Sequence, residues 1–325
     1  MKQINTLCLV SLLVVFSHCN NKAIVTPPTG ESKLRVLGYL HSPWDWVTGV
    51  NSIDLSGITD LNLAFINPDS TGKFEPNTAY HEVIRKAHDK QVKVFLSFGG
   101  GSAPAYLEQL MEEANRPAFI SGLISVAETY DFDGIDVDLE NALINQHYAD
   151  FVYDLAIALK PKNKTLTAAL ASWNANQIHD STLARYDFIN VMSYDKTGPW
   201  NLSRPGQHSP FSMAQDDFNY FNQNRKIAAE KIFIGLPFYG YGFGNGAPSS
   251  MTYKNIINTY PGAQLSDSVS LATGGKIYYN GIPTIQQKVS LAVDRKAGGV
   301  MIWQLLGDSN NEHSLLKAIN EVKNR

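Results

Sequence analysis

Cysteine is scarce in this chain: of its 325 residues only Cys8 and Cys19 carry a thiol. Both lie within the first 19 residues, so a disulfide framework is excluded for the rest of the chain. An excess of either charge is also lacking, because 27 Lys and Arg residues face 30 Asp and Glu residues and the formal net charge is −3. Proteins that bind nucleic acids carry clustered basic residues. Neither a nucleic acid nor an acidic polymer is therefore the expected partner.

Long hydrophobic runs are missing from the N-terminal segment. The apolar run at residues 7–16, which follows Lys2, is too short to span a bilayer and is typical of the core of a signal peptide. Cys19 lies where a bacterial lipoprotein signal is cut and lipidated; the alternative is a soluble secreted protein that is cut nearby. Residues 20–32 are rich in Asn, Pro, Thr and Ser and predict a flexible tether.

Three segments therefore follow from the sequence: a signal peptide at residues 1–19, a tether at 20–32 and one large folded domain at 33–325. The expected location is the cell envelope, with a lipid anchor on the periplasmic side or the outer surface, or outside the cell if the chain is secreted.

Short apolar runs alternate with helical patterns from residue 34 onward. The runs are residues 34–40, 58–66, 92–99, 132–140, 165–171, 188–194, 232–238 and 299–305. The helical patterns are residues 78–90, 103–130, 142–160, 212–230, 284–296 and 312–323. Strands buried on both faces are almost wholly apolar, so the alternation predicts an α/β fold, a (β/α)8 barrel. A doubly wound open sheet is the alternative, but no G-x-G-x-x-G sequence follows the first run.

Residues 239–297, between the seventh and eighth runs, predict only a short insertion, with helices and one small strand at 276–279.

The segment at residues 131–140 reads DFDGIDVDLE, in which Asp136, Asp138 and Glu140 alternate with apolar residues. This alternation predicts a strand with three carboxylates on one face. Like charges so close together cannot all ionise, so at least one group should hold a proton near neutral pH, as general acid catalysis requires. The alternatives are a solvated acidic edge, or a site where these oxygens bind Mg²⁺ or Ca²⁺.

Two other predicted strand ends carry residues suited to an active site. The third run ends in SFGG at residues 97–100, where glycine permits a sharp turn or a close backbone approach. The sixth run ends in MSYD at residues 192–195, with Met192 and Tyr194 on one face that should point into the barrel. Active sites of such barrels lie at the C-terminal ends of the strands, so these residues should meet the acids there.

All five tryptophans fall at or just beyond predicted strand ends. They are Trp44, Trp46, Trp173, Trp200 and Trp303. Aromatic faces gathered around one rim suit stacking against sugar rings; the alternative for each residue is ordinary packing.

The run DGIDVDLE resembles the DGxDxDxE signature of glycoside hydrolase family 18, the chitinases and endo-β-N-acetylglucosaminidases. The Ser-x-Gly-Gly and Met-x-Tyr-Asp sequences resemble two further motifs of that family, and the resemblance extends over nearly all of residues 34–325. Gln304 follows Trp303 where many members carry Glu, and the short insertion argues against a deep, processive cleft. The resemblance implies that the catalytic residues are Asp136, Asp138, Glu140 and Tyr194, and that the substrate-binding residues are Tyr39, Phe65, Ser97, Gly99, Gly100, Met192, Asp195 and Trp303.

The resemblance also implies a substrate-assisted mechanism, which departs from the use of two enzyme carboxylates. Glu140 would protonate the glycosidic oxygen while the 2-acetamido carbonyl of the substrate attacks C1. Asp138 would orient the acetamido N–H, and Asp136, which Ser97 would hydrogen-bond, would share a proton with Asp138. Tyr194 would donate a hydrogen bond to the acetamido oxygen.

The function so implied is a retaining, chitinase-like glycoside hydrolase that cleaves β-1,4 bonds next to N-acetylglucosamine. Its alternative is an endo-β-N-acetylglucosaminidase acting on the chitobiose core of N-glycans; a non-catalytic chitin- or glycan-binding protein and a scaffold of a glycan-uptake system are further alternatives. The expected partner is an N-acetylglucosamine-containing glycan, and no cofactor or metal is expected. We expect a monomer that contacts the membrane only through the lipid on Cys19.

Overall fold

Residues 34–42 and 44–325 are described by a computed structural model. The predicted signal peptide, the tether and Cys19 lie outside these residues. Within the described part of the chain, no helix has both the length and the apolar character needed to cross a membrane.

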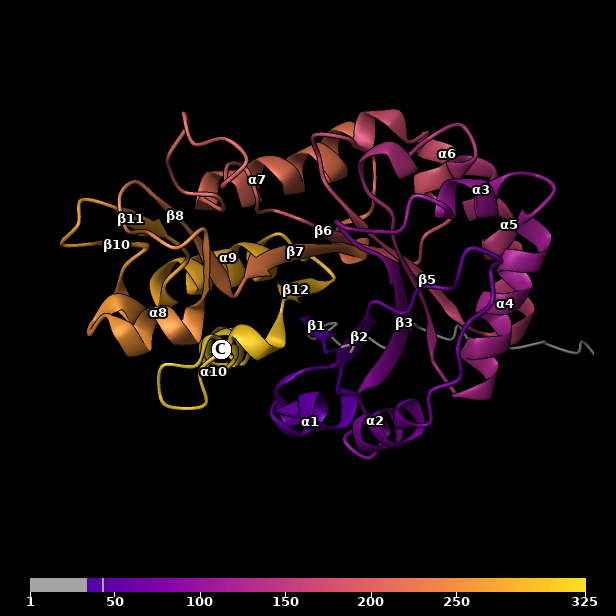
Figure 1. Ribbon diagram of the computed structural model, residues 1–325, viewed down its shortest axis with the longest axis horizontal. Coiled ribbons are helices and arrows are strands. Elements are labelled where there is room, and N and C mark those ends of the chain that lie inside the picture. The colour runs from indigo at the N-terminus through magenta and orange to yellow at the C-terminus, as the bar shows by residue number, and fades with distance from the viewer. Residues whose placement is uncertain (1–33, 43) are drawn as a thin grey trace, which may run out of the picture. The chain divides into compact units, whose positions relative to one another are not determined.

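Eight parallel strands close into a barrel in the order β1-β12-β7-β6-β5-β4-β3-β2, which confirms the predicted (β/α)8 fold (Figure 1). The strands are β1 (Arg35–His41), β2 (Asp60–Ala64), β3 (Lys93–Gly99), β4 (Gly134–Asp138), β5 (Thr165–Leu170), β6 (Phe188–Val191), β7 (Ile232–Pro237) and β12 (Gly299–Trp303). Their residues are almost all buried, because side chains fill the interior and helices cover the outside.

Helices form the outer layer around the strands (Figure 1). They are α1 (Trp46–Asn51), α2 (Ala79–His88), α3 (Leu107–Met111), α4 (Arg116–Thr129), α5 (Tyr148–Leu159), α6 (Asp180–Leu183), α7 (Phe211–Asn219), α9 (Ile282–Asp294) and α10 (Leu315–Lys323). The last helix shows the pattern that places them: Leu315, Ile319 and Val322 recur at helical spacing and are buried in the core between helices and strands.

Three predicted helices are shorter than expected. The pattern at residues 103–130 is divided into α3 and α4, and Pro117 lies in the first turn of α4. Proline has no backbone N–H, which is harmless only in the first turn of a helix, so this residue marks the division. The patterns at 142–160 and 212–230 also shorten to α5 and α7, and a π-helical turn, Tyr220–Asn224, follows α7.

Two strands of the candidate site end earlier than predicted. The strand expected at residues 132–140 ends at Asp138, and the one expected at 188–194 ends at Val191. After β6 the Met192 amide still donates to the Leu170 carbonyl at 2.9 Å, but the next amide, that of Ser193, donates back to the carbonyl oxygen of Val191 at 2.8 Å. The residues that follow therefore lie in loops at the mouth of the barrel.

The short insertion lies between β7 and β12, as predicted, but its content differs from the prediction. It holds an antiparallel sheet of four strands in the order β10-β11-β8-β9 (Figure 1). These elements are β8 (Tyr239–Phe243), β9 (Ser250–Thr252), α8 (Tyr253–Thr259), β10 (Ser268–Ser270) and β11 (Lys276–Tyr278). The predicted helices and the small strand at 276–279 are present as α8, α9 and β11, but the other three strands were missed. β9 and β10 have three residues each, too few to show period-2 alternation, whereas β8 has five.

The barrel separates two apolar layers. Ile135 and Val137 of β4 belong to the outer core, which lies between strands and helices. A smaller inner cluster fills the barrel and consists of Leu37, Tyr39, Ala64, Phe95, Phe188, Tyr194, Phe233 and Met301. Since side chains alternate along a strand, Asp136 and Asp138 face this interior.

The N-terminal end of the barrel interior holds an ion pair. Arg35 Nε donates to Oδ2 of Asp60 at 3.0 Å, and the guanidinium lies 4.5 Å and 5.0 Å from the ring centroids of Phe188 and Phe233. Because these groups fill the N-terminal end, polar side chains of the interior have access to ligands only at the C-terminal mouth.

Candidate active site

The innermost carboxylate, Asp136, is fully buried and accepts four hydrogen bonds. Oδ2 accepts from the Tyr39 hydroxyl at 2.7 Å and from Ser97 Oγ at 2.8 Å. Oδ1 accepts from Thr167 Oγ1 at 2.6 Å and from Asn190 Nδ2 at 3.1 Å. The predicted Ser97 contact is therefore confirmed. Burial raises the pKa of Asp136, and the four donors oppose that rise.

Two of these donors, Thr167 and Asn190, were missed in the sequence. Both lie on barrel strands: Thr167 of β5 is in register with Asp136, and Asn190 of β6 is in register with Ala169, two residues further along β5. Counting alternate positions along the two apolar runs finds them, since a polar residue inside a barrel strand needs a partner there.

Asp138 ends β4 and is 3% exposed. Burial raises its pKa well above the ordinary value, and the nearby Glu140 and Asp136 raise it further. Its Oδ1 has no hydrogen-bond partner among the described residues. A buried, unpaired carboxyl oxygen is costly, so Asp138 is suited to a polar group that a ligand brings into the mouth.

Glu140 lies two residues beyond the end of β4, in extended backbone with φ −119° and ψ 162°. The alternation of the strand therefore continues past its last hydrogen bond to a neighbouring strand. Asp136, Asp138 and Glu140 thus form one row of acids, called the acid row below. Burial raises the pKa of Glu140 to about 7, with a further contribution from the charge of Asp195. A carboxyl group with this pKa can both hold and release a proton near neutral pH, as a general acid must.

The loop after β3 allows the backbone to approach the acid strand closely. Gly99 has φ +102°, and a Cβ there would lie 2.1 Å from the carbonyl oxygen of Asp138. Gly100 has φ +89°, and its Cβ would lie 2.3 Å from the ring of Phe65. The Gly100 amide donates to the Asp138 carbonyl at 2.7 Å. These two glycines thus shape the site through the backbone, which a side chain at either position would displace.

Aromatic residues form the floor of the mouth. Trp303 stacks on Phe65 with ring centroids 5.6 Å apart and an angle of 24°, and meets Tyr39 edge to face at 5.4 Å. Both Trp303 and Phe65 are only partly buried, as is Met192, and all three pack on the inner cluster. An apolar floor with exposed ring faces suits the C–H faces of a sugar ring.

Tyr194 is buried in the inner cluster beside Met192, as predicted, although both lie beyond the end of β6. Its hydroxyl donates to the sulfur of Met301 at 3.7 Å. A thioether is a weak acceptor, so the hydroxyl is available for a stronger acceptor from a ligand.

Asp195 follows in a left-handed conformation with φ +63°. Its Oδ1 accepts from the Tyr239 hydroxyl at 2.5 Å and lies 3.3 Å from Nδ1 of His208. Tyr239 belongs to β8, so the insertion contributes to the site directly. Neither Tyr239 nor His208 was predicted; no motif marks them, since their contacts depend on how the insertion folds back.

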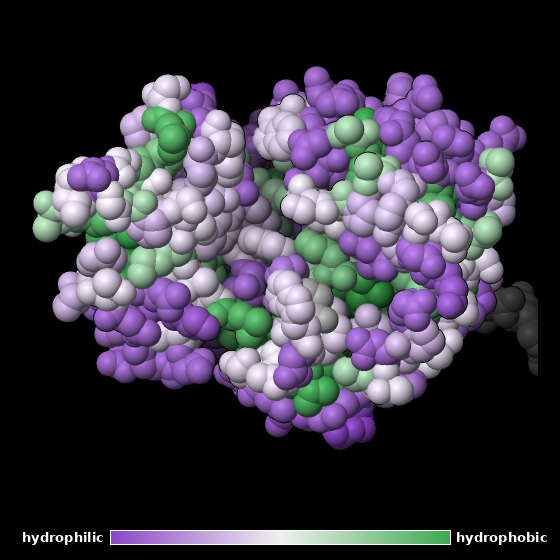
Figure 2. Space-filling view, in the orientation of Figure 1, coloured by the Kyte–Doolittle hydropathy of each residue, from purple (hydrophilic) through white to green (hydrophobic). Residues whose placement is uncertain are grey.

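A cavity of about 290 Å³ lies between the insertion and the barrel mouth. It is lined by His41, Asp195, Phe238, Tyr239, Tyr241, Ser250, Thr252, Trp303, Gln304 and Gly307. Figure 2 shows a hollow between the insertion and the barrel, with pale and green surface along it and mainly purple surface on the outer parts of the molecule. The cavity joins the aromatic floor to Asp195, so it extends the site toward the insertion.

The tryptophans do not all belong to this rim. Trp46 is buried in α1 and packs edge to face on Tyr80 at 5.9 Å, so ordinary packing accounts for it. Trp44, Trp173 and Trp200 are 88%, 57% and 61% exposed. The expectation that all five line a sugar-binding rim was therefore wrong for Trp46.

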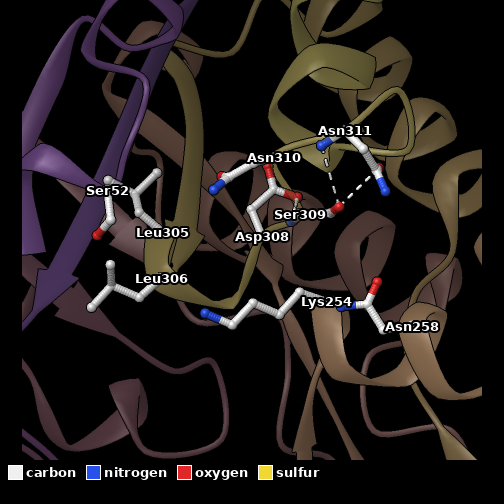
Figure 3. Close-up of a pocket in the computed structure, with 9 residues that line it drawn as sticks. All are labelled: Ser52, Lys254, Asn258, Leu305, Leu306, Asp308, Ser309, Asn310 and Asn311. Atoms are coloured by element: carbon white, nitrogen blue, oxygen red, sulfur yellow. Dashed lines mark hydrogen bonds between the residues drawn. The ribbon is translucent and has the colours of Figure 1, made fainter.

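A second cavity, of about 430 Å³, lies outside the barrel mouth (Figure 3). Its half-buried acid is Asp308, whose two oxygens accept from the backbone amides of Ser309, Leu315 and Leu316 and from Ser314 Oγ. Three of these bonds, those from Ser314, Leu315 and Leu316, fix the start of α10, so the carboxylate is explained by a structural role. None of the predicted site residues lies here.

Within residues 34–42 and 44–325, no group of three or more His, Cys, Asp or Glu side chains is arranged to hold a metal ion.

Comparisons with known proteins agree with this geometry. The family model for "Glycosyl hydrolases family 18" matches residues 35–308. The chain is 29% identical over 283 residues to a probable endochitinase of Caenorhabditis elegans, which covers 70% of this chain and 45% of that protein. It is 25% identical over 274 residues to chitinase-3-like protein 2 of Homo sapiens, with 68% and 70% covered. Among solved structures, the GH18 chitinase ChiB from the chitin utilization locus of Flavobacterium johnsoniae has a TM-score of 0.82 and 34% identity, covering 90% of this chain and 94% of that one.

Proposed function

Since the chain belongs to family 18 of the glycosyl hydrolases, we propose that it is a retaining, chitinase-like glycosidase that cleaves β-1,4 bonds beside N-acetylglucosamine. The observation that carries the proposal is the acid row at the barrel mouth. Its outer member, Glu140, has a pKa of about 7, and its middle member, Asp138, keeps one buried oxygen unpaired.

In the first step Glu140 gives its proton to the glycosidic oxygen while the bond between that oxygen and C1 breaks. The carbonyl oxygen of the substrate's 2-acetamido group forms a new bond to C1 from the opposite face and yields an oxazolinium ion. Asp138 Oδ1 is free to accept the acetamido N–H, which orients the carbonyl and stabilises the positive charge that develops.

In the second step the Glu140 carboxylate takes a proton from water, whose oxygen attacks C1. The bond from C1 to the acetamido oxygen breaks, so the acetamido group is restored and the anomeric configuration is retained after two inversions. Tyr194, whose hydroxyl has only a thioether to donate to in the structure, supports the proposal as the donor to the acetamido oxygen.

Neighbouring-group participation has a direct test. A thiazoline analogue of the oxazolinium ion should inhibit competitively, because transition-state and intermediate analogues bind far more tightly than substrates. Absence of inhibition at millimolar concentration would count against this mechanism.

The substrate is tested by a product profile on two compounds, a chito-oligosaccharide and a high-mannose glycoprotein. We expect release of short N-acetylglucosamine oligomers from the first. The relatives named chitinases favour this result. Release of an intact glycan from the glycoprotein, without turnover of the oligosaccharide, would instead identify an endo-β-N-acetylglucosaminidase.

A further inference from the structure

One buried cation has no part in the reaction described above. Lys288, on α9, is completely buried, and its ammonium group makes three hydrogen bonds. Nζ donates to the carbonyl oxygen of Ser209 at 2.8 Å, to Oγ of Ser209 at 2.6 Å and to Oδ1 of Asn280 at 2.7 Å. Burying an ammonium group is strongly unfavourable unless it is fully hydrogen-bonded. Here each of its three N–H donors has an acceptor.

Ser209 connects this cation to the candidate site. Its Oγ accepts from Lys288 and in turn donates to the carbonyl oxygen of Ser193 at 2.6 Å. Ser193 immediately precedes Tyr194 and Asp195 in the chain. His208, which precedes Ser209, is also completely buried, and its Nδ1 lies 3.3 Å from Asp195 Oδ1.

A buried acid completes the cluster from a second helix. Asp217, on α7, is 4% exposed, and its Oδ1 accepts from Ser172 Oγ at 2.5 Å. Ser172 lies just beyond the end of β5. Burial lowers the pKa of Lys288 to about 7, and the charges of Asp267 and Asp217 oppose this shift. The cluster thus links α7, α9 and the insertion to the loops that follow β5 and β6.

We propose that Lys288 is a positioning residue that acts through Ser209 to fix the turn carrying Tyr194 and Asp195. The turn needs such support because Asp195 is held at φ +63°, which is unfavourable for a residue with a side chain. Two tethers reach it from Ser209 and its neighbour: the hydrogen bond to the Ser193 carbonyl, and the Lys196 amide donating to the His208 carbonyl at 2.9 Å. This inference rests on the proposed function, because it assigns a purpose to the geometry of that site.

A purely structural role for Lys288 would have different consequences. If Lys288 only joins the insertion to the barrel through Asn280, its loss lowers stability and leaves the chemistry of Glu140 unchanged. If Lys288 positions Asp195, its loss lets the Asp195 carboxylate move. The repulsion between Asp195 and Glu140, which helps raise the pKa of Glu140, then weakens. The alkaline limb of the pH profile then moves to lower pH.

The experiment compares the full chain with Lys288→Met and Ser209→Ala, using a chito-oligosaccharide as substrate. We expect Lys288→Met to lower kcat about ten- to a hundredfold, as small misplacements of reacting groups do, and to shift the alkaline limb of kcat/KM to lower pH. Ser209→Ala should lower kcat and shift the alkaline limb in the same directions, but by smaller amounts. In an Asp195→Asn background, Lys288→Met should add less than about twofold, because the two changes act on one interaction.

Hydrogen exchange of residues 193–209 gives a readout that needs no turnover. We expect faster exchange in this segment for Lys288→Met and Ser209→Ala than for the parent, since tethers to the turn are lost. Lys90→Met, the same change at an exposed lysine, is the matched control and should alter neither exchange nor kinetics.

Each possible outcome either supports or overturns the proposed role of Lys288. A folded Lys288→Met variant with kcat within about twofold of the parent and an unmoved alkaline limb overturns the proposal. If Lys288→Met does not fold, Ser209→Ala decides it by the same criteria. If the parent hydrolyses nothing, the proposed function fails, and exchange alone tests the tether: unchanged exchange in Ser209→Ala overturns it.

Discussion

Asp138 and Glu140 are neighbouring carboxyl groups with raised pKa values that differ in exposure and partners. Asp138 is buried between two other acids, whereas Glu140 is partly exposed at the mouth, where a leaving group can reach it. Asp136, beneath both, is stabilised by four donors. The row therefore provides an inner anchor held by hydrogen bonds, a middle group that can share a proton, and an outer proton donor.

The activity should depend on pH through Glu140. This group must be protonated to act as the acid, so kcat/KM should fall above about pH 7, approaching tenfold per pH unit. Asp195→Asn removes the nearby charge that helps raise the pKa, and its alkaline limb should lie at lower pH than that of the parent. The measurement is kcat/KM from pH 4 to 9 for both proteins; coincident alkaline limbs would contradict the influence of Asp195.

The stability should depend on the same group. The pKa of Glu140 is about 7 in the folded chain against an ordinary 4.5. Between these values the folded state binds a proton that the unfolded state has released, so this stabilisation is complete below about pH 4.5 and is lost as the pH rises through 7. We therefore expect Glu140→Gln to melt at a higher temperature than the parent at pH 8, with a smaller difference at pH 5.

Calorimetry at the two pH values checks this expectation. Glu113→Gln, the same change at an exposed glutamate, is the control and should behave like the parent. A Glu140→Gln variant that is less stable than the parent at pH 8 would show that the ionised carboxylate is not strained in the fold.

At the scale of elements, all eight barrel strands could be predicted because short apolar runs that alternate with helical patterns are typical of buried parallel strands. Their ends could not, since β4 and β6 stop where the chain turns toward the mouth, which depends on tertiary contacts. The sequence did contain a signal for the division between α3 and α4, which is Pro117. In the insertion sheet β11 was predicted, whereas β9 and β10 have three residues each and carry no periodicity, and the Tyr-Gly alternation of the five-residue β8 was overlooked. The site contacts of Tyr239 and His208 were missed because they depend on how the insertion folds back, which no local pattern shows.

The loop after β3 offers a test of how an element shapes the site. Gly99→Ala adds a Cβ at φ +102°, 2.1 Å from the Asp138 carbonyl oxygen. Since a backbone atom cannot move aside cheaply, we expect a loss of more than about 1 kcal/mol in the free energy of unfolding and at least a tenfold loss of kcat/KM. Denaturant unfolding and steady-state kinetics measure the two effects.

Gly274→Ala is the matched control for this prediction. Gly274 has φ +93°, but a Cβ there would meet nothing within 4 Å. It therefore carries the same kind of backbone strain without the clash, and we expect about 1 kcal/mol of destabilisation with unchanged activity. Equal kinetics in the two variants would show that the contact of Gly99 with the acid strand is unimportant.

At the scale of the whole molecule, the insertion adds a wall to one side of the mouth, and its strands and its helix α8 are short. The cavity it forms with the barrel, about 290 Å³, is small beside a cleft for a long polymer. We therefore propose action on short stretches of glycan. The signal peptide and tether expected at the N-terminus lie outside the described residues and stay predictions, which rest on apolar length and cysteine position.

We also propose that Cys19 is lipidated and anchors the enzyme to the cell envelope. In a bacterium that processes lipoproteins, the full chain should take up labelled palmitate and sediment with membranes, whereas Cys19→Ala should do neither. Cys8→Ala changes the other cysteine of the same segment and should behave like the parent. Label on the Cys19→Ala variant would overturn this assignment.

The most direct test of the account is hydrolysis of a chito-oligosaccharide by Glu140→Gln, with binding measured by calorimetry on the same preparation. We predict that kcat falls by at least about a hundredfold, as loss of a general acid requires, while the oligosaccharide still binds on the aromatic floor. Turnover within about tenfold of the parent would show that the proton for the leaving group comes from elsewhere and would contradict the central role given to Glu140.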